Sequence, residues 1–169
     1  MGKNTKVEYL NKKVTVTGEF LEQLNNPVDP KSKAFESLLQ RTCFPVRLLY
    51  WLGRLQEKLQ QEARVYFRRR QELLRKNADV WEEDGEGHRK GDIKTNPDGS
   101  VVWKEGIDGV EVLRMMEELR YEPIEIELKK LRVPLECLDV QGKDDKPLSP
   151  AEFAVLGQLV EIVEEEGEE

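Results

Sequence analysis

The chain has 169 residues and a formal net charge of −7, from 34 acidic and 27 basic side chains. Charged residues make up 36% of the sequence and hydrophobic residues 38%, a balance that favours a large surface relative to the core. No segment approaches the roughly 18 apolar residues of a membrane span, and the two cysteines lack the spacing of metal ligands. We therefore expect no membrane segment, no zinc site and no disulfide framework.

The N-terminal region predicts a strand followed by a short helix. Val7, Tyr9, Val14 and Val16 are strand formers, which indicates one strand or a short hairpin. Thr17 carries the hydroxyl of a helix N-cap and opens the first helix.

Prolines mark the next boundaries. Pro27 and Pro30 break the chain, because two prolines this close cannot lie inside a helix, and Ser32 starts a second helix. Pro45 removes a backbone hydrogen bond, so we expect a kink at residues 43–45.

The longest predicted element is an amphipathic helix over about residues 45–77. Apolar side chains recur at helical spacing along one face, which must be buried, and charged side chains occupy the other faces. At 1.5 Å per residue this helix is about 50 Å long, so we expect an elongated molecule. The apolar positions are Leu48, Leu52, Leu55, Leu59, Tyr66 and Leu73.

A hairpin and a returning helix follow. Asn96, Pro97, Asp98 and Gly99 predict a type I turn closed by a left-handed glycine, at the tip of a β-hairpin over about residues 91–104. Because the hairpin reverses the chain, the helix over residues 107–121 should run back along the long helix. Its predicted buried face comprises Val110, Leu113, Met116 (or Met115) and Leu119.

The C-terminal part predicts a strand and a capped helix. Residues 124–128 alternate between apolar and charged, and the alternation changes phase at Lys129 and Lys130, where we expect a bulge or tight bend. Ser149 and Glu152 form a capping box that opens the last helix, which carries apolar residues as far as Val163 before an acidic tail, residues 164–169.

Together these elements predict an α+β fold in one elongated domain. A helical arm over about residues 45–121 carries the hairpin at its tip, in the manner of a prefoldin-like arm. The base comprises residues 1–44 and 122–163, with a small sheet and the capped C-terminal helix. The returning helix is too short to cover the whole leucine face, so the stretch from Leu55 to Leu73 should be buried against the C-terminal helix or a second subunit.

This uncovered stretch is the candidate interface for a protein partner. Trp51 lies outside the leucine face and widens its apolar surface, which suggests a second packing surface, either internal or between subunits. The predicted interface residues are Trp51, Leu55, Leu59, Tyr66, Phe67 and Leu73.

A basic and aromatic stretch near the end of the long helix is the candidate nucleic-acid surface. It comprises Arg64, Arg68, Arg69, Arg70, Arg75 and Lys76. The competing interpretation is that these side chains pair with Glu62, Glu72 and the acidic segments that follow. The acidic net charge favours that second interpretation, so we do not expect nucleic acid to be the main partner.

Other candidate sites have weaker signals. His88, the sole histidine, lies among the acidic residues of the loop from Glu82 to Asp92, where a metal site is conceivable but the alternation of calcium ligands is missing. Glu125 and Glu127 share one strand face, which is typical of a solvated face and less often of an acid/base pair. We predict no metal site and no catalytic residue.

The order of motifs resembles a family of small tailed-bacteriophage proteins of unknown function. The shared landmarks are Phe44 to Tyr50 opening a charged helix, the turn at residues 96–99, Met116 to Leu119 leading into the strand of residues 122–128, and Leu148 to Glu152. The resemblance implies a phage origin and carries over no catalytic residue. The arginine-rich helix end and the long acidic loop depart from the family pattern.

We therefore expect a non-enzymatic phage protein with a role in protein interaction, assembly or chaperone-like binding. No phosphate-binding glycine loop, nucleophile elbow or zinc-binding helix motif is present. The expected partner is a second copy of the chain or a phage or host protein, without a cofactor, in the host cytoplasm or associated with the virion. The alternative is a factor that binds nucleic acid or modulates host transcription through the basic stretch.

Overall fold

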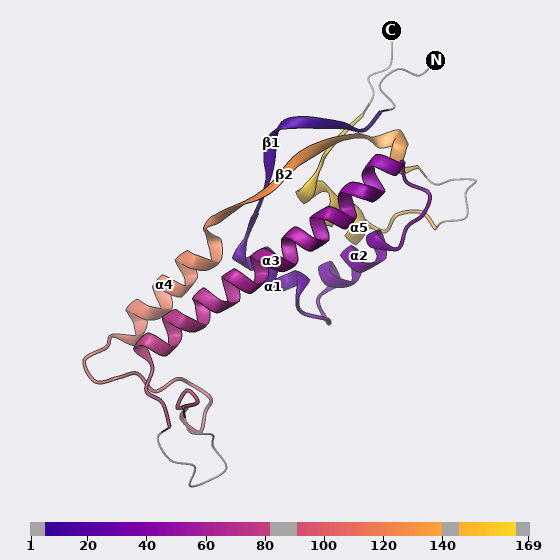
Figure 1. The fold of residues 1–169 in the computed structure, drawn as a ribbon. Helices are drawn as coiled ribbons and strands as arrows, with labels where there is room; N and C mark the ends of the chain where they lie inside the picture. Colours follow the sequence, from indigo (N-terminus) through magenta and orange to yellow (C-terminus); the bar gives the residue numbers. More distant parts are fainter. Residues whose placement is uncertain (1–5, 82–90, 140–145, 165–169) are drawn as a thin grey trace. The chain divides into compact units, whose positions relative to one another are not determined.

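A computed structural model describes residues 6–81, 91–139 and 146–164. It has five helices, one of them long, and a small three-stranded sheet in these ranges, which confirms the predicted α+β class. The elements in chain order are β1 (Glu8–Thr17), α1 (Gly18–Leu24), α2 (Pro30–Leu39), α3 (Val46–Asn77), α4 (Gly109–Tyr121), β2 (Pro123–Pro134), the 3-10 turn η1 (Leu135–Leu138), α5 (Pro150–Leu159) and β3 (Glu161–Val163) (Figure 1).

The chain divides into two compact units. Unit 1 comprises residues 1–63 and 123–169, and unit 2 comprises residues 64–122. The long helix α3 contributes its first part to unit 1 and its second part to unit 2. All three strands therefore belong to unit 1, and α4 belongs to unit 2.

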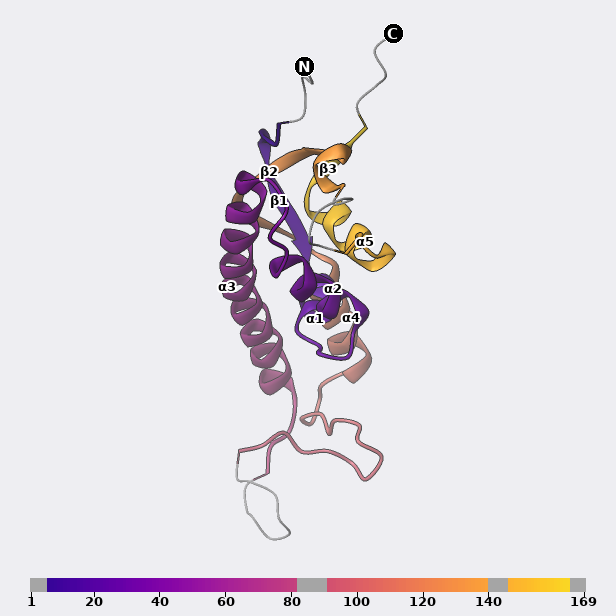
Figure 2. The ribbon, with the colours of Figure 1, turned by 90° about the vertical axis from the view of Figure 1, so that its right-hand side faces the viewer.

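The sheet of unit 1 has the order β1-β2-β3. The central strand β2 is antiparallel to β1 and parallel to β3. A parallel pair needs a crossover connection, which η1 and α5 supply. In Figure 2 the part of α3 that belongs to unit 1 lies to the left of β1, and α5 lies to its right.

The sheet contains the predicted irregularity. In the first part of β2 the buried side chains are even-numbered, Ile126 and Leu128, and after the change of phase Leu131 and Val133 are buried. The ladder with β1 shifts its register on both sides of the pair Lys13 and Lys129, so both strands change phase at the same level. This irregularity keeps both apolar sets of β2 in the core, because a slip of one residue otherwise turns every side chain to the other face.

Side-chain caps start the two N-terminal helices. The Thr17 hydroxyl accepts a hydrogen bond from the Phe20 amide at 3.2 Å, as the sequence predicts. In α2 the Asp29 carboxylate accepts from the Lys31 amide at 2.8 Å, with Pro30 in the first helical turn. The predicted start of α2 at Ser32 is therefore wrong, because aspartate followed by proline is itself a favourable start.

The helix α5 begins where the sequence predicts, but it ends earlier than predicted. The Ser149 hydroxyl accepts from the Glu152 amide, and the Glu152 carboxylate accepts from the Ser149 amide, which completes the capping box. The helix ends at Leu159, and Val163 belongs to β3. The helix predicted to carry Val163 is thus too long, since the β-branched residues at its end pair with β2.

One ion pair is buried in unit 1. Arg41, just after α2, and Glu152, in the first turn of α5, are 8% and 4% exposed. The Arg41 Nη2 lies 2.8 Å from the Glu152 Oε1, and the Ser37 hydroxyl donates to the same carboxylate at 2.9 Å. Arg41 also donates to the carbonyl oxygens of Lys146 and Pro147. These bonds join the end of α2 to the start of α5.

Unit 2 contains the predicted turn. The Gly99 amide donates to the Asn96 carbonyl at 2.8 Å, and Gly99 has a φ of 90°, so the left-handed glycine is confirmed. The Ser100 hydroxyl and amide both donate to the Asp98 carboxylate, which lowers the pKa of that carboxyl.

In place of the strands predicted to flank this turn, the structure has isolated β-bridges. The described bridges join Thr95 to Val101, but they also join residues 78 and 80 to residues 103 and 93. The Asp79 amide donates to Val102, and the Lys94 amide donates to Asp79, at 2.8 and 2.9 Å. Three segments therefore share their backbone hydrogen bonds here, because the residues that follow α3 take part.

Candidate interaction surfaces

Most of the predicted partner interface is buried by the chain itself. Trp51, Leu55, Leu59 and Tyr66 are at most 4% exposed, so they cannot form a surface for another molecule in this fold. Phe67 and Leu73 are half-buried. These four side chains are buried within the chain itself, which for Trp51 is the internal alternative that the sequence left open.

Two short N-terminal helices cover part of this face. Leu59 lines a small cavity of about 150 Å³ together with Leu21 and Leu24 of α1 and Phe35 and Leu39 of α2. The sequence predicted the C-terminal helix or a second subunit in this place. The place of α1 and α2 against α3 depends on the path of the chain through residues 25–45, which no local sequence pattern indicates.

The Trp51 side chain packs inside unit 1 and forms a hydrogen bond to β2 where the sheet is irregular. Its indole N–H donates to the Lys129 carbonyl at 2.8 Å, and its side chain is 1% exposed. Lys129 is the residue where the register shifts, so the tryptophan supplies a donor to this carbonyl where the β1–β2 ladder is irregular.

The predicted buried face of α4 is partly wrong. Val110 and Leu113 are 77% and 56% exposed, whereas Val112 is buried. Met116 and Leu119 are half-buried, as expected for the covered side. Asp108 caps α4 by accepting a hydrogen bond from the Val110 amide, at 3.1 Å.

A shallow groove in unit 2 lies between α3 and α4. Leu73 of α3 and Leu119 and Met115 of α4 supply its apolar side chains. Its polar residues are Arg69, Glu72, Glu118 and Glu122.

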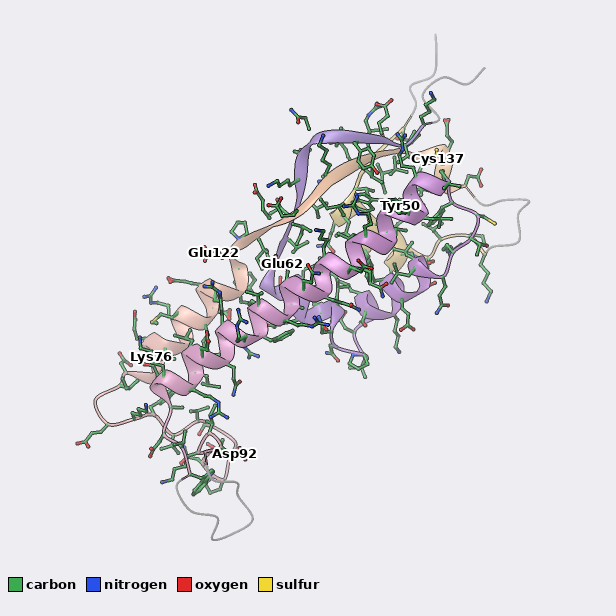
Figure 3. The ribbon with its side chains drawn as sticks, in the orientation of Figure 1. Tyr50, Glu62, Lys76, Asp92, Glu122 and Cys137 are labelled. Carbon is green, nitrogen blue, oxygen red and sulfur yellow. The ribbon has the colours of Figure 1, made fainter. Side chains whose placement is uncertain are left out.

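The predicted nucleic-acid surface is exposed. All six basic residues, Arg64, Arg68, Arg69, Arg70, Arg75 and Lys76, are open to solvent. Figure 3 shows the side chains along α3, from Tyr50 near its start to Lys76 in its last turn.

The expected pairing of these arginines is not observed. No ion pair joins any of the six to a carboxylate within the described ranges, Glu62 and Glu72 included. Arg75 donates to the backbone carbonyl of Gly91 at 2.8 Å, a partner that leaves its charge uncompensated.

Two arginine–tyrosine pairs on unit 1 were missed. The Arg47 guanidinium lies 5.4 Å from the centroid of the Tyr9 ring, and Arg54 lies 5.9 Å from that of Tyr50. The spacing of Tyr50 and Arg54, four residues apart on one helix, was a sufficient signal. Tyr9 and Arg47 come from different elements, and no local pattern joins them.

The strand carboxylates form an ordinary solvated face. Lys13 of β1 lies 2.9 Å from the Glu127 carboxylate and 3.9 Å from that of Glu125. The hydrogen bond and the charge of Glu127 raise the pKa of Lys13. All three side chains are exposed, so these carboxylates interact with a lysine across the strand pair.

The described residues contain neither a candidate metal site nor a candidate membrane span. The described residues hold no group of three or more His, Cys, Asp or Glu side chains placed to bind a metal ion. His88 and most of the acidic loop, residues 82–90, lie outside those residues, as do residues 165–169 of the acidic tail. Cys43 and Cys137 are half-buried and form no disulfide. None of the described helices is both long enough and apolar enough to cross a bilayer.

Comparison with known proteins gives no match. No family model, no curated protein and no solved structure is significantly similar to this chain. The resemblance to small phage proteins thus stays a prediction from the sequence.

Proposed function

We propose that this chain is a non-enzymatic interaction protein that binds a partner through the outer face of α4. The observation that carries this proposal is the exposure of Val110, Leu113 and Tyr121, at 77%, 56% and 48%. These residues lie on one side of α4, with Glu117 between them, at the spacing by which one helix packs against another. Exposed apolar side chains gathered on one helix face are typical of an interaction site.

The partner that best fits this face is a second copy of the chain. An antiparallel pair of α4 helices, with the two-fold axis beside residues 115 and 116, brings Val110 against Tyr121 of the partner subunit. The same axis brings Arg114 against Glu117 of the partner subunit. An apolar contact then forms at each end of the pair and an ion pair forms between Arg114 and Glu117, each repeated by the two-fold axis of an isologous interface.

The setting of this role rests on the sequence alone. An origin in a tailed phage, an assembly or chaperone-like task and a place in the host cytoplasm follow from the family resemblance and the order of elements. The arrangement of α3, the turn region and α4 within unit 2 supports a helical hairpin as the working part.

Sedimentation equilibrium over a concentration series tests the proposal. We expect a reversible dimer, and we expect Leu113→Glu to raise the dissociation constant at least a hundredfold. Each dimer buries Leu113 twice, and burial of one leucine contributes about 1.5–3 kcal/mol.

Val46→Glu is the matched control. Val46 is 81% exposed in the first turn of α3 and lies in unit 1, so this change should leave the dimer intact. A strict monomer at all concentrations, or equal dissociation constants for Leu113→Glu and Val46→Glu, contradicts the proposal.

A further inference from the structure

The second part of α3 presents a row of arginines. With 3.6 residues per turn, Arg64, Arg68 and Arg75 lie within about 40° of one another around the helix axis. We name these three the arginine face. Arg69, Arg70 and Lys76 lie more than about 90° around the helix axis from this face, and all six side chains are exposed.

The charge of α3 is opposite to that of the chain. Its 32 residues include nine basic and three acidic side chains, a net charge of +6, whereas the whole chain carries −7. The remaining residues therefore carry −13. An anionic polymer is repelled by most of this protein and attracted to α3.

The arginine face has free donors and charge. Neither Arg64 nor Arg68 forms an ion pair with a described carboxylate, while on α4 Arg114 pairs with both Glu111 and Glu118. Arg114 of α4 is thus paired with two carboxylates, whereas on α3 Arg64 and Arg68 form no ion pair with a described carboxylate and Arg75 donates to the backbone carbonyl of Gly91.

We infer that the arginine face binds the phosphodiester backbone of a nucleic-acid duplex. Arg64 and Arg75 are separated by about 16 Å along the helix, at 1.5 Å per residue. A duplex presents one negative charge per roughly 1.7 Å of its axis, so about ten phosphates lie within that length. The guanidinium fork fits phosphate oxygens in a bidentate manner, and such contacts do not depend on base sequence.

The composition of the face favours nucleic acid over an acidic protein. Gln61 and Gln71, both exposed, lie on the same side of α3 as the arginines. A protein interface has an exposed apolar or aromatic centre, whereas the apolar side chains nearest this face, Val65 and Phe67, are half-buried. Backbone binding by charge needs no such centre.

The test is fluorescence anisotropy of the full chain with a labelled 20-base-pair DNA duplex of mixed sequence. We expect the logarithm of the binding constant to fall linearly with the logarithm of the salt concentration, with a slope of about −3 to −5. Arg64→Gln with Arg68→Gln should make the slope shallower by about 2 and weaken binding at least tenfold at about 50 mM salt, since two phosphate contacts are lost.

Lys33→Gln with Lys129→Gln is the matched control. Both lysines are exposed on unit 1, and this variant loses the same net charge. It should bind as the unmodified chain does, and circular dichroism verifies that both double variants are folded. Leu113→Glu should also bind DNA normally, which separates this proposal from the α4 interface.

Three results overturn the inference. One is the absence of binding at about 50 mM salt, which leaves an acidic protein as the ligand of this face. Another is equal loss of binding in the arginine and lysine double variants. The third is tighter binding to the single strand of the same sequence, which overturns the assignment to a duplex.

Discussion

Arg41 and Glu152 form a buried pair in which each side chain depends on the other. Arg41→Met should lower the free energy of unfolding by about 3–5 kcal/mol, because it leaves a buried carboxylate without its cation. Arg41→Met with Glu152→Met should recover much of that loss, since two apolar side chains of similar volume can replace a buried pair. Urea unfolding of the three variants measures this cycle, and additive losses would contradict it.

The same pair predicts how stability depends on pH. Burial raises the pKa of Glu152, but hydrogen bonds from Arg41, the Ser149 amide and the Ser37 hydroxyl outweigh this effect and hold that pKa below its usual 4.5. A lowered pKa stabilises the fold above pH 4.5, and this contribution disappears as the pH falls through the lowered value. Glu152→Gln should therefore lose less stability relative to the unmodified chain at about pH 3 than at pH 7; an equal loss at both would refute this.

A glycine is needed at position 109 because the Trp103 side chain lies too close for a larger residue. A Cβ added at this residue would lie 2.1 Å from the Nε1 of Trp103, so Gly109→Ala should displace the indole and lower stability by about 1–3 kcal/mol. Gly53 is the opposite case: it lies on the exposed side of α3, and apart from its chain neighbours and the helix backbone no atom lies within 4 Å of an added Cβ. Gly53→Ala should raise stability by up to about 1 kcal/mol. Thermal unfolding with tryptophan fluorescence distinguishes the two, and similar melting temperatures would be evidence against this account.

At the scale of elements, Trp51 joins α3 to the irregular part of the sheet. Trp51→Phe keeps most of the apolar volume but leaves the Lys129 carbonyl without its donor, so we expect a loss of about 1–3 kcal/mol. Tyr50→Phe, at the exposed neighbouring position, should change stability by less than about 0.5 kcal/mol. Equal changes in the free energy of unfolding for the two variants would show that the indole hydrogen bond does not contribute to stability.

The elements themselves could mostly be predicted from sequence, because their signals are local. The Thr17 cap, the capping box at Ser149, the turn at Gly99 and the change of phase at Lys129 all depend on residues a few positions apart. The face of α4 could not be chosen in this way. Val110 and Leu113 are apolar on one side and Val112 and Leu119 on the other, so periodicity alone permits both.

At the scale of the molecule, the two units differ in the size of their cores. In the described part of unit 2 only Tyr66, Ala78 and Val112 are buried apolar residues, whereas unit 1 buries side chains from α1, α2, α3, α5 and its sheet. Hydrogen exchange should therefore give lower opening free energies for the amides of α4 than for those of β2. Equal protection of α4 and β2 would show that both units open together.

The candidate sites could be predicted less well than the elements. The sequence predicts the leucine face of α3 as an interface, but α1 and α2 lie beside this face at Leu59, and their packing depends on tertiary structure and not on a local pattern. The arginines were correctly placed on the surface, but their lack of partners in the described ranges needed coordinates. Ion pairing depends on distances of a few ångströms, and helical spacing permits more pairs than form.

The order of the strands has a consequence for synthesis on the ribosome. Tyr9 of β1 pairs with Leu131 of β2, and β3 comes later still, so the first strand of the sheet emerges more than a hundred residues before its neighbour. Unit 2 is continuous in sequence and its residues are all available before β2 emerges. During translation β1 is therefore an unpaired strand with an open edge, and it is at this stage that a nascent chain of this fold is most exposed to aggregation.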